Sequence, residues 1–207
     1  SWSAASEALV QSQWTNSTGK DVTETYHRGS YARLDASLAL DDYRVSVDVT
    51  PSAASADDIG LIFRYTDNDN YYRVSLNSLN GFARLESKQG GTFRTLARNF
   101  RGYVPGESHT LAAEVEGSHI QVYVDGDPLF AAYDTDHPSG GIALYSRDDS
   151  IFDNVALSAL GTAPEIVIWK PEAHSLLPGG TVDLDVVAVA RNVPVTTGSI
   201  AVQYSSG

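Results

Sequence analysis

The chain has 207 residues, of which 42% are hydrophobic, and a formal net charge of −12. This composition supplies enough apolar side chains for a buried core and argues against a disordered chain. The excess of Asp and Glu over Lys and Arg argues against nucleic acid and anionic membranes as partners, because both are bound through clustered basic side chains. The absence of cysteine excludes disulfides, thiolate metal ligands and thiol nucleophiles.

The predicted elements are short strands. Apolar and polar residues alternate at a period of two, and Gly, Asn and Asp separate the runs. Many short strands at this spacing are typical of an antiparallel β-sandwich rather than a parallel sheet. In chain order, the runs are Tyr43–Val49, Ile59–Tyr65, Tyr71–Leu76, Phe82–Ser87, His109–Val115, His119–Val124, Ile142–Tyr145 and Ile151–Leu157.

A domain boundary is predicted at Gly161–Pro164. The chain that follows contains the apolar runs Glu165–Trp169, Val182–Val189 and Ser199–Tyr204, which suit the first strands of an immunoglobulin-like sandwich. Such a domain needs roughly 100 residues. We therefore expect a sandwich over residues 1–160 and a partial immunoglobulin-like domain over 161–207. The chain contains no methionine, so we also expect it to be a piece of a longer protein.

Five segments of the first domain carry a family resemblance. In order, they are Asp58–Tyr65, Asn70–Leu76, His119–Gly126, Ser139–Tyr145 and Phe152–Val155. Together they resemble the laminin-G-like branch of the concanavalin-A-like lectin/glucanase superfamily. The resemblance implies a jelly-roll sandwich, a fold that hosts lectins, carbohydrate-binding modules, spacers and enzymes alike.

The second domain carries a resemblance of its own. Pro178–Thr181 followed by Val182–Val189 looks like the first strands of bacterial immunoglobulin-like modules. Such modules occur in strings within secreted polysaccharide-acting enzymes and surface proteins. The resemblance therefore implies a secreted or cell-surface bacterial parent protein.

No catalytic motif is found. The glucan-cutting enzymes of this superfamily carry Glu-x-Asp-x-x-Glu on one strand, and retaining hydrolysis needs two carboxyl groups roughly 5 Å apart. Neither Glu114–Glu116 nor Asp183–Asp185 is followed by a third acid in register. Serine-hydrolase elbows and zinc-helix motifs are absent, and the five histidines lack metal-ligand spacing. The sequence predicts a non-catalytic chain.

A candidate binding face follows from strand parity. If Asp67–Asn70 is a four-residue hairpin loop, Thr66 pairs with Tyr71, and alternate side chains share a face. The core face then contains Ile59, Leu61, Phe63, Tyr65, Tyr72, Val74 and Leu76. The opposite face carries Ile62, Arg64, Tyr71, Arg73, Ser75 and Asn77. A second loop, Ser78–Gly81, adds Phe82, Arg84 and Glu86 to the polar face. In this register, Arg64, Arg73 and Glu86 lie abreast, Ser75 lies beside Arg84, and Asn77 lies beside Phe82.

This polar face predicts the ligand-binding residues Arg64, Tyr71, Arg73, Arg84 and Glu86. Aromatic rings stack on sugar rings, and guanidinium groups bind hydroxyls or uronate carboxylates through paired hydrogen bonds. The alternative is a charge ladder that only solvates and aligns the sheet. Another candidate location is the loop with Tyr145, Arg147 and Asp148, since lectin sites also lie on loops.

Two functions remain open from these observations. The first is a non-catalytic carbohydrate-binding accessory module of a secreted, multidomain polysaccharide-acting enzyme. The alternative is a structural spacer or adhesin segment that positions neighbouring domains and has no ligand of its own.

The resemblance also implies a calcium site. In similar sandwiches, an acid at the position of Asp153 helps to hold a structural calcium ion with oxygens from the N-terminal strand. Calcium takes six to eight oxygen ligands, so Asp153 and backbone carbonyls are suitable contributors. The alternative is a strand-end Asp that bonds to nearby backbone amides.

Overall fold

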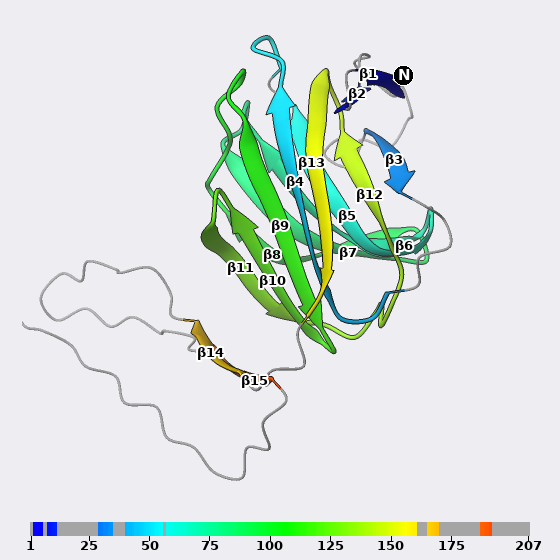
Figure 1. Ribbon diagram of the computed structural model, residues 1–207, viewed down its shortest axis with the longest axis vertical. Coiled ribbons are helices and arrows are strands. Elements are labelled where there is room, and N and C mark those ends of the chain that lie inside the picture. The colour runs from blue at the N-terminus through cyan, green and yellow to red at the C-terminus, as the bar shows by residue number, and fades with distance from the viewer. Residues whose placement is uncertain are drawn as a thin grey trace, which may run out of the picture. The chain divides into compact units, whose positions relative to one another are not determined.

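The computed structural model describes residues 2–5, 8–11, 29–34, 40–55, 57–160, 165–169 and 187–191. Every regular element in these ranges is a strand (Figure 1), and none of them contains a helix that is long and apolar enough to cross a membrane. The chain divides into two compact units, Ser1–Leu160 and Gly161–Gly207.

Two antiparallel sheets stack face to face in the first unit (Figure 1). The predicted antiparallel sandwich is therefore confirmed, and each of the predicted runs lies within a strand. The larger sheet contains, in spatial order, β1 (Trp2–Ala5), β2 (Ala8–Gln11), β13 (Ser150–Ala159), β4 (Tyr43–Pro51), β9 (His109–Glu116), β10 (His119–Val124) and β11 (Asp127–Tyr133). The smaller sheet contains β3 (Ser30–Leu34), β12 (Gly141–Ser146), β5 (Asp58–Asp67), β6 (Asn70–Asn77), β7 (Phe82–Gln89) and β8 (Thr92–Asn99).

The hydrophobic core lies between the two sheets. β4 shows why these residues form strands, since buried and half-buried positions alternate along its whole length. Its inward side chains Tyr43, Val45, Val47 and Val49 pack against residues of the other sheet such as Phe63. Phe63 and Val74, predicted on the core face, are buried, as are Leu85, Val122 and Leu144 on other strands.

The hairpin between β5 and β6 departs from the predicted register. Phe63 pairs with Tyr72 instead of Val74, and the register shifts between Phe63 and Asp67. Arg64, which lies within this bulge, has a φ of 47°, a left-handed conformation that is uncommon for residues other than glycine. The bulge exchanges the faces of two side chains. Tyr65, expected in the core, joins the outer face, and Arg64 leaves that face.

The second unit contains a two-stranded antiparallel sheet. β14 (Glu165–Trp169) pairs with β15 (Val187–Arg191), so that Val167 lies opposite Val189. The predicted run Ser199–Tyr204 and the first half of Val182–Val189 lie outside the described residues.

Candidate functional site

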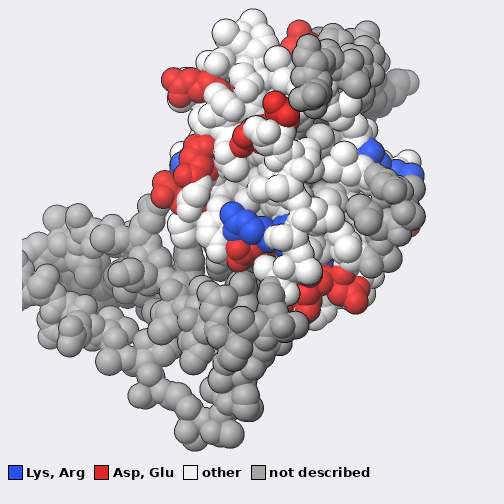
Figure 2. Space-filling view, in the orientation of Figure 1, with Lys and Arg blue, Asp and Glu red and all other residues white. Residues whose placement is uncertain are grey.

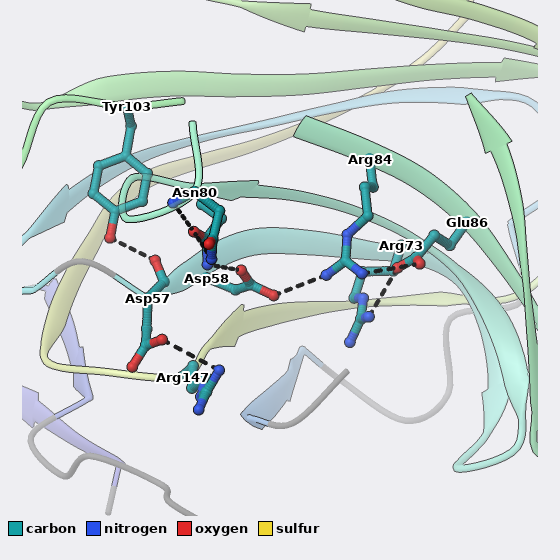
Figure 3. Close-up of polar contacts among 9 residues, drawn as sticks. Asp57, Asp58, Arg73, Asn80, Arg84, Glu86, Tyr103 and Arg147 are labelled. Carbon is teal, nitrogen blue, oxygen red and sulfur yellow. Dashed lines mark hydrogen bonds and ion pairs between the residues drawn. The ribbon is translucent and has the colours of Figure 1, made fainter. Parts of the chain in front are cut away.

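The outer face of the six-stranded sheet carries a network of four buried charged side chains (Figure 3). Arg73 Nη2 donates to Glu86 Oε2 at 2.8 Å, and both side chains are only 1% exposed. Arg84 lies between two carboxylates, 3.0 Å from Asp58 and 3.5 Å from Glu86. The Asn77 amide donates to the other oxygen of Asp58. The network thus joins strands β5, β6 and β7 through paired charges.

The predicted register of β6 and β7 is confirmed. Arg73 lies opposite Glu86, Ser75 opposite Arg84, and Asn77 opposite Phe82. The Ser78–Gly81 turn fixes this pairing, because Gly81 N–H donates to Ser78 O and Gly81 adopts a φ of 58° that glycine accepts without strain. A change of one residue in this loop would have turned the charged side chains toward the core.

Aromatic rings surround the network. The Arg73 Cζ atom lies 4.6 Å from the ring centroid of Tyr145 and 4.5 Å from that of Phe93. A second buried cluster on this face contains Ile62, Tyr65, Tyr71, Ala143 and Tyr145. Gly60 makes room for the Tyr145 ring, since a Cβ atom there would lie 3.1 Å from the ring and 2.2 Å from the Val74 carbonyl oxygen. The outer face is therefore packed like a second core.

Burial has an electrostatic consequence for Asp58. Removal from water raises the pKa of this carboxyl group, and the Arg84 charge and the Asn77 hydrogen bond offset only part of the rise. A buried ion pair costs free energy to desolvate, and its attraction roughly repays that cost. The network is consequently better suited to fixing side-chain positions than to adding stability.

The predicted binding residues meet on this face with one exception. Tyr71, Arg73, Arg84 and Glu86 lie there together, but Arg73 and Glu86 are enclosed by their neighbours. Arg64 is the exception, because its predicted position on the outer face was wrong. Its buried guanidinium donates to three carbonyl oxygens, of Asp41 at 2.8 Å, Gly117 at 2.6 Å and His137 at 3.1 Å. Arg64 is a structural link between loops, because the bulge turns it away from the outer face.

The one predicted residue of the network with an opening to solvent is Arg84. A cavity of about 220 Å³ adjoins it, lined by Asn80, Phe82, Arg84 and Arg98. Arg98, on β8, lies directly opposite Arg84. The ring centroid of Phe82 lies 4.7 Å from the Arg84 Cζ atom and 5.2 Å from that of Arg98. We call this the Arg98 pocket.

Sequence reasoning missed Arg98 because it missed β8. This edge strand reads Thr-Phe-Arg-Thr-Leu-Ala-Arg-Asn, with polar residues on both faces, and so lacks a clean alternation. The signal that could have found it is the Gly90–Gly91 turn after β7, which predicts a hairpin partner.

A second cavity lies at the β5–β6 hairpin. It has a volume of about 490 Å³ and is lined by Arg33, Tyr65, Gly90 and the hairpin residues Thr66–Asn70. Here Arg33 lies 5.4 Å from the Tyr65 ring, and Tyr65 donates its hydroxyl hydrogen to Asn68 at 2.7 Å. The lining carries two carboxylates, Asp67 and Asp69, against the one guanidinium of Arg33. Hydrogen bonds from the Asp69 backbone amide and the Asn70 side chain hold the pKa of Asp67 below its usual value.

The alternative loop site does not form an open cluster. Tyr145 is buried on β12 beneath the Arg73 guanidinium. Arg147 pairs with Asp57 at 3.2 Å (Figure 3), and the Asp148 side chain accepts from the Asp149 amide. These residues are committed to local contacts.

Asp153, the predicted calcium ligand, lies opposite Asp48 on the seven-stranded sheet. Its carboxylate accepts from the Asn154 amide at 2.7 Å, and the Asn154 side chain donates to Asp48 at 2.8 Å. Within the described residues, no group of three or more His, Asp or Glu side chains is placed to hold a metal ion. The calcium site stays a prediction.

Comparison with known proteins places the fold. No family model and no curated protein matches the chain. Among solved structures, the carbohydrate-binding module CBM66 from Bacillus subtilis is similar with a TM-score of 0.64 at 18% identity, covering 77% of this chain and 91% of that one. Galectin-Ib from Xenopus laevis has a TM-score of 0.53 at 11% identity, covering 63% and 100%. Galectin-Va from the same species has 0.52 at 15%, covering 63% and 96%.

At these identities the likeness concerns the fold alone, and the first unit has a galectin-like β-sandwich fold. The similar structures are named as a carbohydrate-binding module and galectins. The prediction of a non-catalytic chain rests on the sequence.

Proposed function

We propose that the first unit is a non-catalytic carbohydrate-binding module whose ligand binds at the Arg98 pocket. The observation that carries the proposal is the composition of this pocket: an aromatic ring, two guanidinium groups and a side-chain amide around one opening. Support also comes from the fold, which is similar to that of a carbohydrate-binding module and of galectins.

The chemistry of the pocket suits a sugar. The ring of Phe82 offers an apolar surface to the C–H face of a pyranose, and Arg84, Arg98 and Asn80 offer N–H donors to its oxygens. The floor is held in place, because Arg84 is fixed by Asp58 and Glu86 before any ligand arrives. Such preorganisation lowers the entropy cost of binding.

The predicted residues divide into two groups under this proposal. Arg84 contacts the ligand, while Glu86, Arg73 and Tyr71 hold Arg84 and its surroundings in position. The ligand site thus moves toward β8 relative to the prediction from strand parity.

The wider context belongs to the same proposal. We place the module in the laminin-G-like branch, within a secreted or cell-surface multidomain protein that acts on polysaccharides and continues into an immunoglobulin-like domain. The sequence resemblances support this context, and Asp153 is the residue that would contribute to a structural calcium site.

A structural spacer is the second candidate. The closure of the Arg73–Glu86 pair favours it, since a network that satisfies its own charges needs no ligand. A spacer would retain no glycan.

A glycan array followed by calorimetry tests the proposal. A charge-assisted hydrogen bond contributes about 1.5–3 kcal/mol, so Arg98→Ala should weaken binding about tenfold or more. Arg44→Ala is the matched control, because Arg44 also stacks on a ring, that of Tyr123, but lies on the other sheet. An array that stays blank for every polysaccharide would favour the spacer.

A further inference from the structure

We infer that the saccharide bound at the Arg98 pocket carries a carboxylate group, as in polymers of uronic acids. This inference rests on the proposed function and deepens it by naming the ligand class. It follows from the charge of the pocket, the partners of its arginines and the pairing of two strands.

The lining of the pocket is cationic in an acidic protein. The chain contains 26 Asp and Glu residues and 14 Lys and Arg residues, and acidic side chains spread over the face shown in Figure 2. The Arg98 pocket nevertheless contains two guanidinium groups and no carboxylate among its lining residues. The hairpin cavity differs, since Arg33 shares it with Asp67 and Asp69. Of these two cavities, only the Arg98 pocket favours an anion.

Arg98 also differs from its neighbours in its partners. Arg84, Arg94 and Arg101 each lie within 4.0 Å of two carboxylates. Among the residues that the structure describes, no carboxylate lies within this distance of Arg98. The Arg98 charge is therefore available to a ligand.

Strand pairing places the two guanidinium-bearing residues side by side. Arg84 and Arg98 lie directly opposite each other on β7 and β8. Like charges at such positions destabilise a sheet. Asp58 and Glu86 offset the charge of Arg84 from within the network, but in the described part of the chain no carboxylate within 4.0 Å offsets that of Arg98. An anion in the cavity would lie beside both groups and remove the repulsion.

The geometry suits a carboxylate on a sugar ring. A guanidinium group presents paired N–H donors that match the two oxygens of a carboxylate. The Arg98 guanidinium lies 5.2 Å from the Phe82 centroid and 5.7 Å from that of Phe100, and these rings limit its orientation. The cavity, at about 220 Å³, is smaller than the roughly 300–1,000 Å³ that encloses a drug-sized ligand. It therefore fits one sugar unit of a longer chain.

The experiment compares acidic and neutral forms of the same saccharide. Oligomers of galacturonate, glucuronate and mannuronate are titrated by calorimetry into the full chain, each beside its carboxyl-reduced neutral counterpart. We expect at least one uronate oligomer to bind, its reduced form to bind tenfold more weakly or worse, and Arg98→Gln to cause a similar loss. Arg44→Gln removes the same charge from the other sheet and should leave the affinity unchanged.

Other outcomes overturn the inference in distinguishable ways. If the neutral oligomers bind as well as the acidic ones and Arg98→Gln weakens both, the inference fails but the carbohydrate-binding proposal stands. If sulfated saccharides bind and uronates do not, the inference likewise fails and the carbohydrate-binding proposal stands. If uronates bind equally to wild type, Arg98→Gln and Arg44→Gln, the pocket is not the site. If no saccharide binds at all, the proposed function fails with the inference.

Discussion

The outer faces of the two sheets differ in what they do with charge. On the six-stranded sheet, Arg73 and Glu86 are buried as a pair, and two aromatic rings flank the Arg73 guanidinium. On the outer face of the seven-stranded sheet, the ion pair of Arg44 and Glu114 is 37% and 12% exposed. The seven-stranded face has the ordinary hydrated surface of a sandwich. The six-stranded face has the packing of a core, so its charges are held in place for something other than solubility.

The largest expected difference between the faces comes from removing one partner of each pair. Glu86→Ala leaves Arg73 buried without its carboxylate, which costs about 3–5 kcal/mol of unfolding free energy. Glu114→Ala breaks a partly exposed pair and should cost less than about 1 kcal/mol. Urea unfolding of the two variants measures both values. Similar losses in the two variants would show that the outer faces are energetically alike.

Two carboxyl groups, one from each sheet region, should change the stability of the protein with pH in opposite directions. Burial raises the pKa of Asp58 above its usual value. As pH rises from about 3.9 through its folded-state pKa, the folded protein holds a proton that the unfolded chain has lost, so this group lowers stability. For Asp125, at the β10–β11 turn, burial alone would raise the pKa, but hydrogen bonds with His109 and the Thr110 amide hold it lower than usual. The contribution of Asp125 to stability is lost as pH falls from about 3.9 through its folded-state pKa.

Nuclear magnetic resonance titration of the two carboxyl groups checks these signs. Asp58 should titrate above about 3.9 and Asp125 below it. The variants Asp58→Asn and Asp125→Asn identify the resonance of each carboxyl group. Each variant should also remove the contribution of that group to the pH dependence of the unfolding free energy. If Asp58 titrated below the usual value, its pairing with Arg84 would outweigh its burial, and the network would be stabilising after all.

The fold and the β6–β7 register could be predicted because both depend on local signals. Strict alternation marks the strands, and the turn ending in Asn80–Gly81 fixes which residues face each other. The position of Arg64 could not be predicted, because its left-handed conformation leaves no mark in the sequence. Contacts far along the chain, including those with Asp41, Gly117 and His137, compensate for that conformation.

The burial of the charged network could not be predicted from the sequence either. Parity places Arg73 and Glu86 on the outer face, but it does not show that the rings of Phe93 and Tyr145 flank the Arg73 guanidinium. Burial of an outer face depends on rings from strands that are distant in sequence, so the predicted ladder looked accessible. The solvent-accessible part of the face, at Arg98, lies on β8, the strand that the alternation pattern did not reveal.

The smallest stability effect is expected at Phe100, whose ring lies beside Arg98. The side chain of Phe100 is 85% exposed, so Phe100→Ala should change the unfolding free energy by no more than about 0.5 kcal/mol. Leu157→Ala, on β13 of the other sheet, is the partly exposed control and should also have a small effect. The two variants should differ in their affinity for the saccharide. The Phe100 ring lies 5.7 Å from the Arg98 guanidinium and limits its orientation before a ligand binds. Ordering an unrestrained arginine side chain on binding costs about 0.5–1 kcal/mol. Loss of the ring should therefore weaken saccharide binding about two- to fivefold, while Leu157→Ala leaves it unchanged. A large loss of stability in Phe100→Ala would make the ring structural, and unchanged affinity for a saccharide that requires Arg98 would place the ring outside the site.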